Sequence, residues 1–380
     1  MGGGDVLRVR GSQQLRLRLV LATLSGSTLR VDDIRARDAA PGLRDHEASL
    51  LRLLEKISHG SSVEINETGT KLKYKPGILV GGRNLVHDCG CSRSIGYFLE
   101  PLLILGLFGK TSLTISLKGI TNDVTDPSVD AFRSTTLPML KQFGVPTEDL
   151  ELKIITRGAP PLGGGEVRLK VPMVPTSLSA ATWTDEGMVK RIRGVAYSTR
   201  VSPQMANRMI DSARGIFNRL LPDVYIFTDH YTGHESGKSP GYGISLVAET
   251  TTGCMLSSEK AATPLHQEGD GAVDADTDAR EPQLPEDIGL QAALVLLEEI
   301  KQGGVVDSTH QALLFMLCAL SAEDVSKVRV GKLSPYGIQT LRLIKEFLGV
   351  QFNIKPDPAS GTVILTCVGS GYKNFSRKVS

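Results

Sequence analysis

The sequence VRVGKLSPYGIQTLRLIKEFLG, residues 328–349, contains a strand-like run, a short loop and an amphipathic helix. The alternation Val-Arg-Val predicts a strand at 328–330. A helix is predicted over 338–348 because four apolar residues recur at helical spacing, namely Ile338, Leu341, Ile344 and Leu348. Gly349 provides the left-handed residue that commonly ends a helix. The stretch therefore predicts a strand followed by a helix that packs against its sheet.

Two earlier parts of the chain follow the same plan of apolar helix, strand, loop, second helix and closing strand. The predicted elements are 13–24, 29–34, 45–57 and 63–65 in the first copy, 95–107, 113–117, 128–143 and 150–155 in the second, and 309–320, 328–330, 338–348 and 350–352 in the third. Pro138 is expected to distort the helix that contains it. A repeated unit of this kind predicts α/β sheets covered by helices, with the copies packed around a common core.

A segment of different character separates the second copy from the third. Strands are predicted at 191–198, 223–231 and 243–253, with a helix that Ser202 and Pro203 begin. This segment predicts a small α/β domain at 187–283, inserted between a large-domain part at 1–186 and the third repeat with the C-terminal tail at 284–380. Residues 264–287 are rich in acidic side chains and poor in large apolar ones, so they predict a disordered acidic loop.

The composition is that of an ordinary globular protein. The chain has 380 residues, 41% hydrophobic and 22% charged, with a formal net charge of +2. Binding to nucleic acid would therefore depend on local clusters of Arg and Lys. The most apolar stretch, 97–109, contains Glu100 and Pro101 and is too short to span a membrane, so a buried helix and no membrane association are expected. Five scattered cysteines predict a reducing compartment and no metal site.

The most distinctive segment is RGAPPLGGGEVRL, residues 157–169. Three consecutive glycines, 163–165, allow the backbone to approach another strand or an anion closely. The simpler interpretation is a turn between the strands predicted at 150–155 and 166–171. The residues alone favour that turn.

This segment resembles the signature of the RNA 3'-terminal phosphate cyclases. The stretches 12–16 (SQQLR), 34–36 (IRA) and 41–43 (PGL) resemble further segments of that family, so the resemblance covers nearly the whole chain. It implies an α/β (α+β) fold, with a large domain of three repeated βαβαβ-type units and a small α/β domain inserted before the third unit. Cyclases of this family use ATP to adenylylate a histidine, pass AMP to an RNA 3'-phosphate and close a 2',3'-cyclic phosphate.

The sequence departs from the cyclase pattern at the nucleophile. If Thr340 matches the threonine of the family's His-x-x-Thr motif, the nucleophile position is Gly337. His310, the nearest histidine, is expected at the surface or cap of its helix. Arg10 and Arg37 stand where the family has glycines, and they would crowd an ATP pocket. No catalytic residue, no cyclase activity and no cofactor are therefore expected.

These departures resemble the cyclase-like proteins of ribosome biogenesis. That resemblance implies a nuclear, nucleolar factor that acts in the early pre-rRNA cleavages leading to small-subunit rRNA. The implied partners are a large nucleolar GTPase assembly factor and the small-subunit processome, with pre-rRNA as a candidate ligand.

Three hypotheses for the function remain open. The leading one is a catalytically silent scaffold that retains an anion or RNA pocket made of Gln13, Arg16, Arg35 and Arg44. The second is a pre-rRNA endonuclease that uses Arg342, Lys345 and Glu346, or a partner contact made by them, although the residues alone favour a solvated helix face. The third, an active cyclase with a relocated nucleophile, has no supporting feature in the sequence.

Overall fold

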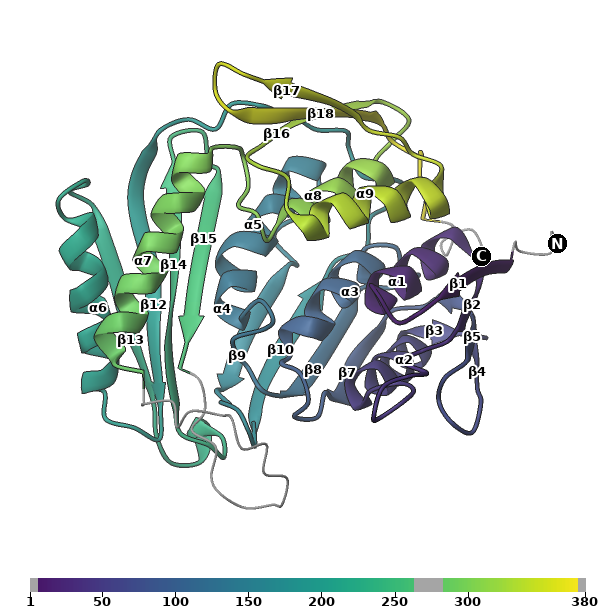
Figure 1. Ribbon diagram of the computed structural model, residues 1–380, viewed down its shortest axis with the longest axis horizontal. Helices are drawn as coiled ribbons and strands as arrows, with labels where there is room; N and C mark the ends of the chain where they lie inside the picture. Colours follow the sequence, from purple (N-terminus) through teal and green to yellow (C-terminus); the bar gives the residue numbers. More distant parts are fainter. Residues whose placement is uncertain (1–5, 263–282, 375–380) are drawn as a thin grey trace.

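A computed structural model describes residues 6–262 and 283–374 (Figure 1). The first unit consists of β1 (Val6–Arg10), α1 (Leu15–Ser25), β2 (Thr28–Asp32), α2 (Asp45–Ile57), β4 (Ser62–Ile65) and β5 (Leu72–Lys75). Its sheet has the strand order β1-β2-β5-β4, in which β1 and β2 are parallel and the other pairs are antiparallel. The short strands β3 (Ser58–His59) and β6 (Ile78–Leu79) pair beside this sheet.

The second and third units repeat this topology. The second contains β7 (Gly82–Asp88), α3 (Gly96–Gly106), β8 (Leu113–Gly119), an irregular helix, β9 (Glu151–Thr156) and β10 (Gly165–Val171). The third contains β11 (Thr182–Trp183), α8 (Gln311–Leu320), β16 (Val325–Val330), α9 (Pro335–Leu348), β17 (Asn353–Asp357) and β18 (Thr362–Val368). Their orders, β7-β8-β10-β9 and β11-β16-β18-β17, match the first sheet strand for strand. The predicted α/β fold with three repeated units is confirmed.

The three units share one core. Helices α1, α3 and α8 are apolar on nearly all sides, and each contributes most of its residues to a single buried cluster. A helix that is apolar all round is stable only where it is surrounded by protein. The buried helix predicted within 97–109 is thus confirmed, and no described helix combines the length and apolarity needed to cross a bilayer.

The helix predicted at 128–143 is broken into four short segments, α4 (Val129–Ala131), the π-helix η1 (Phe132–Thr136), α5 (Leu137–Met139) and the 3₁₀ helix η2 (Leu140–Phe143). Pro138 has no N–H, and in a regular α-helix its ring would clash with the carbonyl one turn earlier. The π-helical turn directly before it widens the backbone at that point. The expected distortion at Pro138 is confirmed.

The strand predicted at 350–352 is wrong, because the pairing strand, β17, begins at Asn353. Val350 and Phe352 do pack on the core, but they do so from the loop that follows Gly349. Gly349 itself is left-handed, with φ 70°, and ends α9 as expected.

The inserted module has its own sheet and its own core. It contains β12 (Val189–Thr199), α6 (Gln204–Phe217), β13 (Val224–Tyr231), the 3₁₀ turn η3 (Gly233–Ser236), β14 (Gly241–Thr250), β15 (Met255–Ala261) and α7 (Pro285–Gln302). The strand order is β13-β12-β14-β15, and α6 and α7 cover one face (Figure 1). Since β11 pairs with β16, the module follows the first strand of the third unit and precedes its helices.

Helix α7 differs from the prediction in two ways. It was assigned to the third unit from residue 284, but Ile288, Ala292 and Leu296 pack in the core of the inserted module. The predicted acidic loop reached residue 287, whereas the helix begins at Pro285. Proline is tolerated in the first turn of a helix, and acidic side chains are favoured there by the helix dipole. Residues 264–282 of the predicted loop lie outside the described residues.

Candidate functional site

The loop before α9 is held against α8 by hydrogen bonds from one glutamine. The Gln311 side chain accepts the N–H of Ser334 at 2.8 Å and donates to the carbonyl of Lys332 at 2.9 Å. The Ser334 hydroxyl in turn accepts the Gly337 N–H at 3.1 Å and caps the helix. The loop is thus a fixed helix start.

Gly337, the position that the resemblance assigns to the nucleophile, is closely surrounded by three side chains. A Cβ atom there would lie 3.1 Å from Gln311 Oε1, 3.1 Å from Ser334 Oγ and 3.2 Å from the Phe315 ring. These contacts are shorter than ordinary van der Waals contacts, so the neighbours would have to shift to accept any side chain. The position therefore carries no nucleophile, and a larger residue there would require its neighbours to move.

Arg16 of α1 connects all three units next to this loop. Its Nη2 donates to Glu100 Oε2 at 2.8 Å and to the Tyr336 hydroxyl at 3.2 Å, and its Nη1 donates to the Tyr97 carbonyl at 3.1 Å. Burial opposes the charged form, but Tyr336 and Glu100 outweigh burial and raise the pKa of Arg16. Arg16 is therefore a permanent cation whose side chain is 16% exposed.

The Tyr97 ring is the centre of a basic cluster. The guanidinium groups of Arg16 and Arg93 each lie 4.9 Å from its centroid. The His46 ring packs against it in a T-shaped arrangement, with the two ring centroids 5.1 Å apart. Burial, together with the charges of Arg93 and Arg35, lowers the pKa of His46. Sequence reasoning missed this cluster as a site, although Arg93, Tyr97 and Glu100 lie close together in the chain, within residues 92–100.

The remaining candidates for an anion pocket lie in different environments. Arg35 forms two parallel hydrogen bonds with Glu47, at 2.8 and 2.7 Å, and Glu47 is buried. Arg44 is 41% exposed and lies 3.8 Å from Asp38. Gln13 is exposed, and its neighbour Gln14 instead reaches Gln339, at 2.6 Å. Arg16 and Arg35 thus already have carboxylate partners, whereas Gln13 and Arg44 face solvent.

The candidate endonuclease residues occupy the outer face of α9. Arg342, Lys345 and Glu346 are all exposed, while Leu343, Ile344 and Phe347 face the core. Within the described residues, these three charged side chains form no ion pair or hydrogen bond that would fix them relative to one another. General acid–base chemistry needs positioned groups. The geometry is that of a solvated or partner-binding helix face.

The glycine-rich signature holds a buried arginine between the large domain and the inserted module. Arg157 is fully buried and donates to both oxygens of Asp130 at 2.7 Å, and its Nε donates to Asp229 of β13 at 2.8 Å. The rings of Tyr197 and Tyr231 lie 5.0 and 5.8 Å from its guanidinium. Burial opposes ionisation of Asp130, but Arg157 outweighs burial and lowers the pKa of that carboxyl. Arg157 therefore joins the two parts of the molecule.

The glycines of the signature allow this close approach. A Cβ on Gly158 would lie 2.3 Å from the Gly165 nitrogen, and one on Gly237 of the module would lie 2.5 Å from the Arg157 carbonyl. Backbone hydrogen bonds from Arg157 N–H to Glu235 and from Lys238 N–H to the Gly163 carbonyl complete the contact. The turn between β9 and β10 predicted from the residues is confirmed, and it also forms the joint with the inserted module.

A hydroxyl, an imidazole and a carboxylate are aligned at His310. Asp307 contacts His310 Nδ1 at 2.8 Å, and His310 Nε2 lies 2.8 Å from the Thr136 hydroxyl. Although burial disfavours the charged form, Asp307 outweighs it and raises the pKa of His310. His310 was expected at the surface or cap of its helix. It is the N-cap of α8, as one of these alternatives predicted, but it is buried there, where it joins the second and third units.

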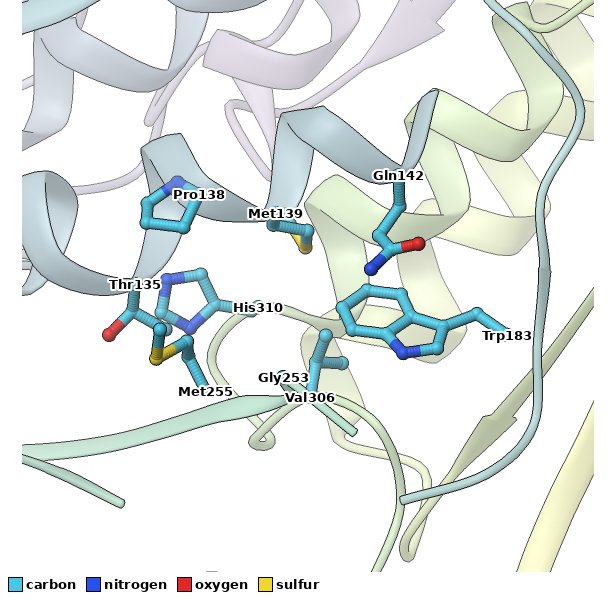
Figure 2. Close-up of a pocket in the computed structure, with 9 residues that line it drawn as sticks. All are labelled: Thr135, Pro138, Met139, Gln142, Trp183, Gly253, Met255, Val306 and His310. Atoms are coloured by element: carbon cyan, nitrogen blue, oxygen red, sulfur yellow. The ribbon is translucent and has the colours of Figure 1, made fainter. Parts of the chain in front are cut away.

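The cavity next to His310 is too small for a substrate. Figure 2 shows Thr135, Met255 and Trp183 around it, and its volume is about 20 Å³. One water molecule needs roughly 10–15 Å³ on this measure. The buried Thr135 hydroxyl has no hydrogen-bond partner among the described residues, so a single water fits the cavity chemically. The three aligned groups are therefore a structural contact and not a hydrolytic site.

Among the described residues, no three His, Cys, Asp or Glu side chains are grouped as a metal ion would require.

Comparison with known proteins matches this chain to one family. The family model for RNA 3'-terminal phosphate cyclase matches residues 7–354. A probable RNA 3'-terminal phosphate cyclase-like protein of Arabidopsis thaliana is 61% identical, over 98% of this chain and 99% of the relative. The RNA 3'-terminal phosphate cyclase-like protein of Homo sapiens is 53% identical, over 98% and 97%. The rRNA processing protein rcl1 of Schizosaccharomyces pombe is 43% identical over the whole of both chains. Since the matches extend over nearly the full length, this chain belongs to the RNA 3'-terminal phosphate cyclase family.

Proposed function

We propose that this protein is an rRNA-processing factor of ribosome biogenesis, which acts in the nucleus and nucleolus as a catalytically silent member of the cyclase family. The full-length similarity to a relative named as an rRNA processing protein supports the process. The observation that carries the silent role is the glycine at position 337, where the resemblance places the nucleophile and where a Cβ atom would lie within 3.2 Å of Gln311, Ser334 and Phe315. Without a nucleophile at this position, AMP cannot be taken up covalently there.

In this proposal the protein contributes surfaces to the early pre-rRNA cleavages that lead to small-subunit rRNA. Its partners are a large nucleolar GTPase assembly factor and the small-subunit processome. The outer face of α9, with Arg342, Lys345 and Glu346, is the candidate contact for a protein partner, because its charges are exposed and unpaired within the described chain. Pre-rRNA is the candidate ligand.

Two measurements test the proposal. Incubation of the purified protein with labelled ATP should leave no covalent AMP, and RNA with a 3'-phosphate should not be cyclised; a labelled adduct would refute the silent role. A pull-down from nucleolar extract should recover the GTPase and small-subunit precursors, and an unrelated set of partners would refute the assignment to ribosome biogenesis.

The endonuclease hypothesis is tested with the same purified protein. Cleavage of a pre-rRNA fragment that is lost in the double variant Arg342→Ala/Lys345→Ala would assign that activity to the outer face of α9. Cleavage that is unchanged in the variant would exclude these residues from the reaction.

A further inference from the structure

The sheet of the inserted module has one face that helices do not cover. Side chains alternate along its strands, so Ile226 and Ala196 point to the core under α6 and α7, while Phe227 and Val195 point to the other face. One end of that second face is docked on the large domain, through Asp229 and Arg157. Beyond this contact a cleft of about 280 Å³ separates the sheet from α4 and η1. Its volume is close to the lower limit of small-molecule sites, roughly 300 Å³.

Two aromatic rings lie on this face at the edge strand. Tyr225 and Phe227 are 55% and 52% exposed, and they contact each other edge to face with their centroids 4.4 Å apart. Phe227 lines the cleft. An exposed aromatic face on a β-sheet is a common platform for the bases of single-stranded RNA, since every base can stack on it.

A buried hydroxyl without a partner also lines the cleft. Ser245 is 4% exposed, and its Oγ has no hydrogen-bond partner among the described residues. The strand register places Phe227, Val195 and Ser245 side by side across β13, β12 and β14. An unpaired buried hydroxyl is costly, and a polar atom at the edge of a base stacked on Phe227 would satisfy it.

Cationic side chains line this cleft and a neighbouring one on the large domain. Arg133 of η1 is 47% exposed, and its nearest carboxylate, Asp130 at 3.8 Å, is already bound to Arg157 by two shorter hydrogen bonds. A neighbouring cleft shares Arg133 and is also lined by Lys141 and Lys153, neither of which forms an ion pair within the described residues. Glu151 is the acidic residue in that lining. Three cations in succession fit consecutive phosphates better than a single one.

We propose that this cleft binds one nucleotide of a single-stranded RNA, with the base stacked on Phe227 and the backbone following Arg133, Lys141 and Lys153. A base with an attached phosphate is also present in a free nucleotide, so the chemistry at Phe227 is shared by both sources. The three cations favour a polynucleotide over a free nucleotide, and the choice of RNA rests on the proposed function. The site lies on the inserted module and η1, away from the cluster around Arg16.

The test measures binding of labelled oligoribonucleotides of about eight residues to the full chain by fluorescence anisotropy. Phe227→Leu keeps an apolar side chain but removes the ring, and it should weaken binding by about 10-fold, since loss of one stacking contact typically has that effect. Phe227→Tyr should bind as the wild type does. Arg133→Ala should weaken binding to all sequences and should reduce the slope of log affinity against log salt by about 0.7.

The matched control is Arg214→Ala, an exposed arginine on α6, on the opposite side of the module. Its binding should equal that of the wild type, and thermal unfolding should show all variants folded. AMP and UMP are measured alongside the oligomer, because equal affinity for a mononucleotide would assign a free-nucleotide site and overturn the proposal. Oligomer binding that is unchanged in both Phe227→Leu and Arg133→Ala would also overturn it. Recovery of small-subunit precursors in the pull-down would still support the proposed function in either case, so the two failures are distinguishable.

Discussion

The guanidinium groups of Arg16 and Arg157 both bind a carboxylate and contact tyrosine rings, but the two side chains differ in burial and in the number of their partners. Arg157 is fully enclosed, and two aspartates and Asn122 accept from all three of its nitrogens. Arg16 has one carboxylate partner, and its side chain remains 16% exposed. Arg157 joins the inserted module to the large domain, whereas Arg16 lies where the three repeated units meet.

The two clusters are expected to contribute differently to the stability of the fold. The Arg157 contact depends on residues of both parts of the molecule, so a change at any one of them leaves a buried charge unpaired. Around Arg16 the charges border solvent, and Gly337, the position that the resemblance assigns to the nucleophile, is closely packed nearby. We therefore expect the free energy of unfolding to depend mainly on the cluster around Arg157, and the cluster around Arg16 to tolerate substitution.

The largest loss in the free energy of unfolding is expected for Arg157→Ala. The variant leaves Asp130 buried without its cation, and removal of one member of a buried ion pair costs about 3–5 kcal/mol. Urea unfolding followed by the fluorescence of Trp183, the single tryptophan, measures this loss. Arg16→Ala is the matched comparison, and equal unfolding midpoints for the two variants would contradict the distinction between the clusters.

A smaller, pH-dependent change in the free energy of unfolding is expected for Glu259→Gln, at the contact between the inserted module and the large domain. Glu259 Oε1 accepts the Ser128 N–H at 2.8 Å, while its Oε2 is buried without a partner among the described residues, beside Asp130 and His310. Burial raises the pKa of Glu259 to about 7, because its effect is larger than that of the hydrogen bond from Ser128, which lowers the pKa. Because the pKa is higher in the folded state, the folded protein binds the extra proton, and its stability falls as pH rises from about 4.5 to about 7.

The glutamine variant carries no such charge. It should be more stable than the wild type at pH 8, by roughly 2–3 kcal/mol, with the difference disappearing near pH 4.5. Urea unfolding of both proteins across this pH range measures this difference. A difference that does not change with pH would show that Glu259 is charged in the folded protein throughout.

The third expected effect concerns Gly337. Gly337→Ala introduces a Cβ within 3.1 Å of Gln311 and Ser334, and overpacking of this kind costs about 1–3 kcal/mol. Gly337→His should be less stable still and should not form covalent AMP with labelled ATP, because the loop is fixed as a helix start. An adduct in that variant would show that the pocket around Arg16 still binds ATP productively.

The sequence predicted the elements with strong periodicity and missed those without it. Helix α2 was predicted with its observed bounds because Leu50, Leu54 and Ile57 give it one apolar face. Strand β11 has only two residues, too few for any pattern, so the point at which the module enters the third unit could not be predicted. The boundary predicted at residue 284 placed the residues of α7 in the third unit, whereas they pack in the core of the inserted module, a contact that no local pattern identifies.

The candidate site was predictable only where a residue type was itself informative. The absence of histidine at Gly337 and the unusual glycine run are visible in the sequence alone. The partners that give these positions their roles are distant in the chain, since Gln311 lies 23 residues before Ser334 and Asp229 lies 72 residues after Arg157. No local spacing encodes such contacts, so neither the packed loop nor the interdomain joint could be derived before the fold was known.

The smallest effect is expected for Tyr336→Phe, which removes one hydrogen bond from the Arg16 cluster. Arg16 keeps its bonds to Glu100 and to the Tyr97 carbonyl, and the lost bond is long, at 3.2 Å. The cost should be about 0.5–1.5 kcal/mol, the usual net value of one hydrogen bond. Tyr97→Phe is the control in the same cluster, because it keeps the ring that both guanidiniums contact. If Tyr336→Phe instead unfolds as readily as Arg157→Ala, the Arg16 cluster contributes to stability as much as the interdomain joint does, and the loop before α9 has a structural role beyond capping its helix.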